Sequence, residues 1–262
     1  LFMILPVFAL YGQDLEGATP ALIGIAIGAY GLTQALFQIP FGLLSDRIGR
    51  KPVIIAGLLI FLLGSLVAAQ AETIYGVIAG RTLQGAGAIA SAIMALLTDL
   101  TRDDQRAKAM AMVGASIGMS FALALVAGPV LADWFELRGL FLFTAVLAGF
   151  GVALTVWVVP APDVRKIFRD TRPVVSHFSD VLRDTGLLRL DFGVFCLHMV
   201  LTASFVVLPG WLLTNADMDK NHHWMIYLPI LFLSFVLMLP LMIVAEKARK
   251  IKQVFLLAVL LL

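Results

Sequence analysis

The sequence predicts an all-α membrane protein made of successive membrane-spanning helices. Hydrophobic residues make up 61% of the 262 residues and charged residues only 14%, and the mean hydropathy is +0.98. A soluble domain is about half apolar and a quarter charged. The apolar residues also form runs close to the ~20 residues that a helix needs to cross a bilayer. Strands of a membrane barrel would be shorter and would alternate, so helices are expected.

Apolar segments follow one another along the whole chain. The first, 1–11, is interpreted as the end of a helix and the last, 254–262, as the start of one. The segments between them are 20–44, 52–70, 73–100, 107–132, 139–159, 187–213 and 222–245. We therefore predict an N-terminal six-helix bundle over 1–159 with a truncated first helix. Residues 187–262 would begin a second bundle with helices seven to nine.

The longest connection, 160–186, is predicted to be a linker between the two bundles. Within it, "SHFSDVLRDTG" and the preceding Val175 suggest a short helix that stops at Gly186, with Val175, Phe178, Val181 and Leu182 on one side. Such an amphipathic helix would lie along the inner membrane surface. A solvated charged linker explains the same residues, and the sequence leaves both interpretations open.

A short repeat relates the two halves. The segment "PFGLLSDRIGRKPV" at 40–53 aligns without a gap with "PLMIVAEKARKIKQ" at 240–253. Pro40 falls on Pro240 and Asp46 on Glu246. Duplication of a helical half would produce such a match and predicts two pseudo-symmetric bundles.

Positive charges gather in alternate connections. The connections after the second, fourth, sixth and eighth segments carry most of the basic residues: Arg47, Arg50, Lys51; Arg102, Arg106, Lys108; Arg165, Lys166, Arg169, Arg172, Arg183, Arg189; and Lys247, Arg249, Lys250, Lys252. The opposite connections carry only Arg138 and Lys220 among basic residues, together with several acids. Because cytosolic loops are enriched in Lys and Arg, the even-numbered loops and the linker are predicted to be cytosolic.

Asp46 is the unexpected residue in the first basic connection. It lies at the C-terminal end of a predicted helix, where the macrodipole is already negative and cations are favoured. We therefore expect a partner from outside the motif, either an arginine or the positive N-terminus of another helix. Asp99, at the cytosolic end of the fourth segment, is the expected partner of Arg50. The alternative is a solvated Asp46 beside arginines that only orient the helix.

Arg81 is the one basic residue inside a predicted span. A buried arginine needs a partner or a watery cavity, and Gln84 at i+3 shares its helix face. We expect Arg81 either to tune a proton-accepting group or to bind an anionic part of a substrate. A structural arginine bonded to backbone carbonyls is the alternative.

Other polar residues within spans are candidates for a cavity. Tyr30, Gln34 and Gln38 recur every four residues on the second segment, and Ser116 and Ser120 do so on the fifth. Polar groups in lipid need partners, so both stripes should face protein or a cavity. Interhelical hydrogen bonds explain them equally well.

Three further features of the spans bear on packing and mechanism. His198 has the titration range of a proton relay, although a packed hydrogen-bond donor is the commoner role; Asp191 is a second candidate. Gly128 and Pro129 predict a bend of the fifth helix, because proline removes a backbone hydrogen bond. Gly24, Gly28 and Gly31 share one helix face and predict close helix packing.

The motifs resemble those of the major facilitator superfamily. Gly42-x-x-x-Asp46-Arg47-x-Gly49-Arg50-Lys51 is similar to the signature between the second and third helices of that family. Arg81-x-x-Gln84-Gly85-x-Gly87-Ala88 resembles its fourth-helix motif, and Gly128-Pro129 the core of its antiporter motif. The resemblance covers essentially the whole chain.

The resemblance implies a major facilitator superfamily fold with two six-helix bundles, of which about nine helices are present here. It implies a bacterial inner-membrane transporter that works by alternating access, closest to proton-driven exporters of small amphipathic compounds. Asp46 would meet a helix N-terminus of the other half. The conformational latch would comprise Gly42, Asp46, Arg47, Gly49, Arg50, Lys51 and Asp99.

Two alternative functions remain open at this point. A proton-coupled importer of a polar solute such as a sugar would have more polar cavity residues, and a membrane sensor would need no transport at all. An enzyme is not expected, because no nucleophile–base pair is apparent. Neither a metal site nor a phosphate-binding glycine loop is present in the sequence, so no cofactor is expected. The expected partners are a small-molecule substrate, protons and the lipid bilayer, with no nucleic acid, and the protein is expected to be a monomer.

Overall fold

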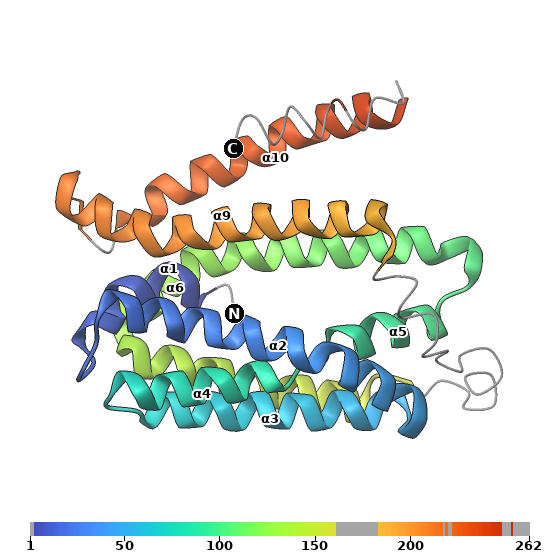
Figure 1. Ribbon diagram of the computed structural model, residues 1–262, viewed down its shortest axis with the longest axis horizontal. Coiled ribbons are helices and arrows are strands. Elements are labelled where there is room, and N and C mark those ends of the chain that lie inside the picture. Colours follow the sequence, from blue (N-terminus) through green and yellow to red (C-terminus); the bar gives the residue numbers. More distant parts are fainter. Residues whose placement is uncertain (1–2, 161–182, 217, 220–221, 248–252, 254–262) are drawn as a thin grey trace.

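The computed structural model describes residues 3–160, 183–216, 218–219, 222–247 and 253. The described residues form these helices: α1 (Ile4–Tyr11), α2 (Pro20–Ile48), α3 (Arg50–Gln70), α4 (Ile74–Ala86), α5 (Ala90–Leu100), α6 (Arg106–Trp157), α9 (Thr185–Asn215) and α10 (Trp224–Lys247), with the short 3₁₀ turns η1 (Gly12–Asp14) and η2 (Asp103–Gln105). Five helical stretches are long and apolar enough to cross a membrane. Figure 1 shows the long helices running side by side along one direction. The predicted all-α class is confirmed.

The junction between α2 and α3 is tighter than the sequence predicted. We expected a connection over 45–51, but α2 continues to Ile48 and α3 begins at Arg50. Gly49 alone separates them, with φ of 102°, a conformation that favours glycine. Asp46 and Arg47 therefore end α2, whereas Arg50 and Lys51 open α3, where the helix dipole disfavours positive charge.

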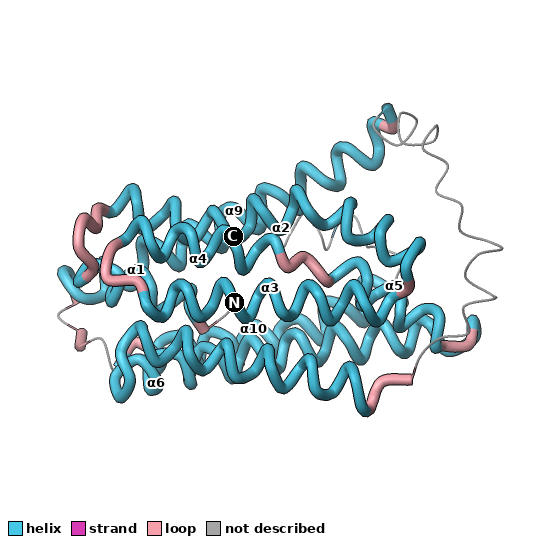
Figure 2. The backbone as a smooth tube through the Cα atoms, turned by 90° about the horizontal axis from the view of Figure 1, so that it is seen from below, coloured by secondary structure: helices cyan, strands magenta, loops and turns pink. Residues whose placement is uncertain are grey.

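The fourth predicted segment is two helices rather than one. Residues 87–89 are not helical, and they separate α4 from α5 in the middle of the layer (Figure 2). A Cβ on Gly87 would lie 2.3 Å from the carbonyl oxygen of Gly57 in α3. The break thus lets the backbone of this segment approach α3 more closely than any side chain would allow.

α6 contains both the fifth and the sixth predicted segments. Glu136 interrupts it with φ of 57° and ψ of −171°, between the predicted boundaries at 132 and 139. The chain reverses there, so the two parts of α6 lie in different layers (Figure 1). The bend predicted at Gly128 and Pro129 stays a prediction, because their backbone angles remain helical. A Cβ on Gly128 would lie 2.8 Å from the Met3 carbonyl oxygen, so α1 crosses α6 closely here.

Glycines on α3 and α4 hold the centre of the first bundle together. α3 packs against α4 and the second part of α6, and α2 packs against α4. A Cβ on Gly64 would lie 2.5 Å from the Gln84 amide nitrogen, and one on Gly85 would lie 2.2 Å from the Tyr30 carbonyl oxygen. Gly24, Gly28 and Gly31 have open space beside them within the described residues, so their role in close helix packing stays a prediction.

Helices α9 and α10 of the second half pack against α1 and α6 of the first, and Phe121 of α6 also contacts Phe205 of α9. α1 packs against α9, and α6 packs against α10. α9 and α10 meet at the left of Figure 1 and separate toward the right. Most of the apolar side chains of α9 are exposed, including Phe192 and Phe195, whose rings stack with centroids 6.5 Å apart.

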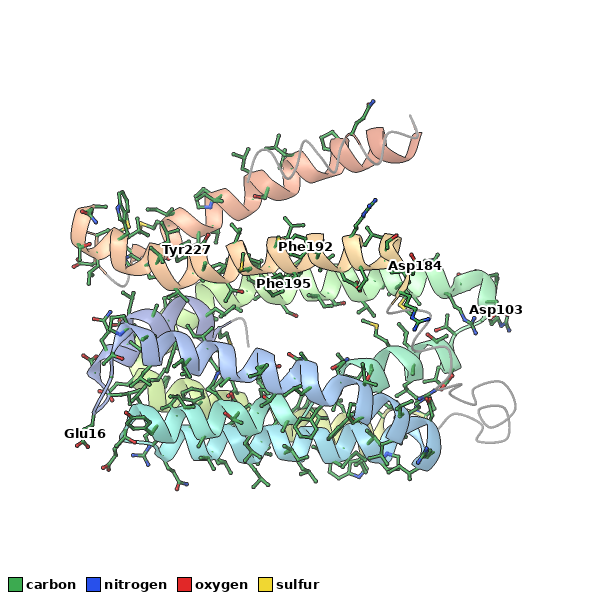
Figure 3. All side chains as sticks on the ribbon, in the orientation of Figure 1. Glu16, Asp103, Asp184, Phe192, Phe195 and Tyr227 are labelled. Atoms are coloured by element: carbon green, nitrogen blue, oxygen red, sulfur yellow. The ribbon has the colours of Figure 1, made fainter. Side chains whose placement is uncertain are left out.

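The connections alternate between the two ends of the bundle. Figure 3 shows Asp103 and Asp184, which belong to even-numbered connections, at one end and Glu16 at the other. That the end with Asp103 and Asp184 is the cytosolic one stays a prediction from the charge pattern. Most of the predicted amphipathic helix lies outside the described residues, but Gly186, which was predicted to end it, instead lies in the first turn of α9. Residues 248–252 of the repeat and the predicted ninth span, 254–262, also lie outside the described residues.

Candidate functional site

Arg50 is the centre of a charged cluster at the α2–α3 junction. Its side chain is 5% exposed. Its Nε donates to Asp99 Oδ2 at 3.0 Å, and its Nη1 donates to Ser45 Oγ at 2.7 Å and contacts Asp46 Oδ1. A guanidinium at the start of a helix is thus balanced by carboxylates from α2 and α5. The cluster ties together three helices at one end of the bundle.

Asp46 finds its partner inside the motif. The sequence predicted an arginine or a helix N-terminus from outside it, but within the described residues the ion pair is with Arg50, four positions along the chain. The reason is the Gly49 turn, which folds the start of α3 back toward the end of α2. Asp46 remains 22% exposed and Asp99 24%.

The neighbouring motif residues act on the surrounding helices. Lys51 Nζ donates to the Val159 carbonyl oxygen at 2.7 Å and lies 3.4 Å from that of Val156, so it caps the C-terminus of α6. A Cβ on Gly42 would lie 3.2 Å from Ser91 Oγ of α5. Arg47 lies exposed in the last turn of α2.

Arg81 is 1% exposed and has neutral partners. Its Nη1 donates to Gln84 Oε1 at 2.8 Å, its Nε donates to the Ala26 carbonyl oxygen at 3.4 Å, and its Cζ lies 4.6 Å from the centroid of the Tyr30 ring. Nη2 has no hydrogen-bond partner among the described residues. The backbone contact fits the structural alternative, whereas the unpaired donor leaves capacity for a further ligand.

A hydrogen-bonded chain extends from Arg81 into α3. Gln84 Nε2 donates to Ser65 Oγ at 2.7 Å, and Ser65 Oγ donates to the Phe61 carbonyl oxygen at 2.8 Å. Ser65 is fully buried, and sequence reasoning missed it. Gly64 of α3 lies against the backbone of Gln84, and Gly80 of α4 lies against Ala68, so α3 and α4 come near enough for this chain to form.

The polar stripe on α2 lines cavities. Tyr30 and Gln34 border a cavity of about 360 Å³ that also touches α3, the 87–89 break, α5 and α6. Gln34 and Gln38 border a neighbouring hollow of about 310 Å³. Gln38 Oε1 is buried and has no partner among the described residues. Within the described residues these side chains border cavities, and none of the three makes a hydrogen bond to another helix.

The remaining predicted residues are not brought to these groups. Ser116 donates to the Met112 carbonyl oxygen of its own helix at 2.8 Å, and Ser120 borders a separate, largely apolar cavity. His198 is exposed on α9, with Nδ1 3.0 Å from the Val194 carbonyl oxygen. Asp191 is also exposed on α9.

His223 and Tyr227 form a buried polar pair that sequence reasoning missed. Their rings lie 6.4 Å apart at the start of α10, and neither His223 Nδ1 nor the Tyr227 hydroxyl has a partner among the described residues. Burial lowers the pKa of His223 from its ordinary value, although the Met218 carbonyl, 3.2 Å from Nε2, opposes the shift. His222 and His223 are adjacent in the sequence, and no pattern in the sequence shows that His223 is buried while His222 is exposed.

No cluster of three or more metal-ligating side chains exists among the described residues. The site is thus a set of buried arginines, carboxylates and amides. Such groups bind charged or polar species and change partners without covalent chemistry.

Comparisons with known proteins agree with this architecture. The family model described as "Major Facilitator Superfamily" matches residues 1–262. The chain is 52% identical over 97% of its length to the inner membrane transport protein YajR of Escherichia coli, of which it covers 56%. It is 31% identical over 70% of its length to multidrug resistance protein D of the same organism, covering 46% of that protein.

A third relative is an uncharacterized transporter of Buchnera aphidicola, 38% identical over 91% of the chain and covered to 61%. The chain thus covers 56% and 61% of the lengths of two of these relatives. The full-length family match, the relatives and the Asp46–Arg50–Asp99 cluster lead to one assignment: the chain belongs to the major facilitator superfamily, as its motifs predicted.

Proposed function

We propose that this chain forms part of a secondary active transporter of the bacterial inner membrane, which exports small amphipathic compounds by alternating access and is driven by protons. Several relatives are named transport or multidrug resistance proteins. The observation that carries the proposal is the Arg50 cluster, a buried cation held by two partly exposed carboxylates at one end of the bundle.

The cluster serves as a conformational latch. Arg50 contacts Asp46 Oδ1 and Asp99 Oδ2, and the second oxygen of each carboxylate accepts no hydrogen bond from the described residues. The two carboxylates remain 22% and 24% exposed. Donors from the second bundle bind there when the cytosolic end closes, and they leave when it opens. Because charge-assisted hydrogen bonds are strong but replaceable, such a cluster can favour one state without locking it.

Arg81 supplies the coupling. A buried guanidinium with neutral partners and a spare N–H donor favours a negative charge nearby. A proton-accepting carboxylate or an anionic part of the substrate that approaches Arg81 is stabilised in its charged form. Loss of its proton is then easier in the state that brings it to Arg81, which links proton release to conformation.

The test is transport by the full-length protein in proteoliposomes with an imposed pH gradient, screened over cationic dyes and sugars. We expect dye movement that depends on the gradient and collapses when a protonophore dissipates it. Gradient-driven sugar uptake without dye transport would instead identify an importer of polar solutes. Absence of any flux with both classes would reject the proposal in favour of a sensor.

A further inference from the structure

A small pocket lies at the seam between the two halves of the chain. It has a volume of about 220 Å³ and is bordered by α6 of the first half and by α9 and α10 of the second. Its principal lining residues are Phe121, Ser204, Phe205, Leu208, Tyr227 and Ser234. Figure 3 shows Tyr227 where α9 and α10 lie close together. The pocket is separate from both arginine sites.

Tyr227 brings an unused donor to this pocket. Its side chain is 6% exposed, and its hydroxyl has no hydrogen-bond partner among the described residues. A buried hydroxyl without a partner is costly in an apolar environment, so a site that leaves one in its wall favours a ligand with a hydrogen-bond acceptor.

The two serines do not satisfy this donor. Ser204 donates to the Val200 carbonyl oxygen and Ser234 to that of Ile230, each at 2.8 Å and each within its own helix. Their protons are therefore used locally. The Tyr227 hydroxyl is consequently the polar group best placed to orient a molecule in the pocket.

Aromatic rings form one wall. The Phe121 and Phe205 rings lie 5.9 Å apart at 82°, and the Phe205 and Tyr227 rings lie 5.9 Å apart at 57°. Tilted aromatic groups of this kind accept a further flat ring in edge or offset contact. The volume is below that of a usual drug-sized pocket, so it holds one ring system rather than a large ligand.

We propose that this pocket binds a flat aromatic ring system that carries a carbonyl acceptor, with the Tyr227 hydroxyl donating to the carbonyl oxygen. The proposal rests on the proposed function and names the class of substrate that the transporter takes. Since α6 and α10 belong to different halves, a bound ring bridges the seam and is held only while these helices stay together.

The test compares coumarin with naphthalene, two flat bicyclic probes of which only coumarin has a carbonyl. Binding to the full-length protein in lipid nanodiscs is measured by equilibrium dialysis, without a pH gradient. We expect Tyr227→Phe to weaken coumarin binding about five- to tenfold and to leave naphthalene unchanged, because it removes only the donor. Ser204→Leu, which fills the pocket, should abolish binding of both probes.

Tyr75→Phe is the matched control, because Tyr75 lies 65% exposed on α4 and should affect neither probe. If Ser204→Leu does not fold, Ser234→Leu fills the same pocket from α10 instead of α9. Equal loss of both probes in Tyr227→Phe, or no loss of coumarin, would overturn the proposal. Recovery of phospholipid alone from the pocket would do so too. Because no flux is measured, failed transport with intact probe selectivity rejects only the proposed function.

Discussion

Arg50 and Arg81 are both buried, but their charges are balanced in opposite ways. Arg50 contacts carboxylates of Asp46 and Asp99 at the end of the bundle. Arg81 lies within a span and contacts an amide oxygen, a backbone carbonyl and the face of Tyr30. The first site pairs one cation with two carboxylates, whereas among the described residues the second has no carboxylate beside its positive charge.

In the function that we propose, this difference separates two tasks of the chain. A paired ion cluster at a helix junction holds elements in position through charge-assisted hydrogen bonds. A buried cation without a counter-charge lowers the pKa of a carboxyl group that approaches it. The comparison therefore assigns conformational control to Arg50 and coupling to Arg81, and each assignment can be broken by substitution.

Replacement of Arg81 should have the largest effect. Arg81→Met keeps the volume but removes the charge and its hydrogen bonds, so gradient-driven transport should fall about 10- to 100-fold. Arg81→Lys, which retains the charge, should lose less. Proteoliposome flux is the measurement, and melting temperatures of both variants separate misfolding from lost coupling. Wild-type flux in Arg81→Met would refute the coupling role.

Breaking the Arg50 cluster should come next. Arg50→Gln leaves two carboxylates without their cation and should destabilise the protein by about 3–5 kcal/mol. Asp46→Asn keeps the fold better and should shift the resting population toward the inward-open state. Labelling of single cysteines on each side of the membrane measures that shift. Asp103→Asn is the control, because its ion pair with Arg106 is exposed at the same end. Unchanged accessibility in Asp46→Asn would disprove the latch.

The close packing that positions Arg81 should show a smaller effect. Gly85→Ala places a methyl group 2.2 Å from the Tyr30 carbonyl oxygen and should cost about 1–3 kcal/mol of stability. Gly28→Ala, on the open face of α2, should cost little. Thermal unfolding in detergent compares the two. If both alanines cost the same, helix propensity rather than backbone contact governs this packing.

The smallest effect concerns acid sensitivity outside the arginine sites. Because burial lowers the pKa of His223, the unfolded chain binds its proton more readily than the folded one. Its contribution is constant above the ordinary histidine pKa of ~6.5 and becomes destabilising as pH falls below it. His223→Gln should flatten the dependence of the melting temperature between about pH 5 and 7. His222→Gln, at the exposed neighbour, should not.

Much of the fold followed from residue pattern. Apolar run length placed the helices, and the acidic residues around Glu136 marked the reversal within α6. The break at 87–89 did not follow, because Gly85 and Gly87 within an apolar run do not reveal which backbone they will meet. The helix ends beside Gly49 were predicted several residues too far from it, at 44 and 52. The polar residues between these positions extend α2 to Ile48 and start α3 at Arg50.

The candidate site was predictable in composition but less so in pairing. The Arg50–Asp99 pair was predictable because both residues lie at the same end of the bundle in the predicted arrangement of spans. The turn that brings Arg50 beside Asp46 depends on the backbone angles of Gly49, and the spacing of residues in the sequence does not reveal those angles. Tyr227 was missed because only packing separates a buried hydroxyl from an exposed one.

The interruption at 87–89 has a consequence for biogenesis. α4 and α5 have 13 and 11 residues, so they rise about 20 Å and 16 Å, and neither crosses a ~30 Å hydrocarbon layer alone. The segment 74–100, formed by α4 and α5, also carries Arg81 in α4, so a translocon should insert it poorly on its own. It should leave the insertion machinery only after α2 and α3 are present, since they supply the backbone and Tyr30 ring against which it folds.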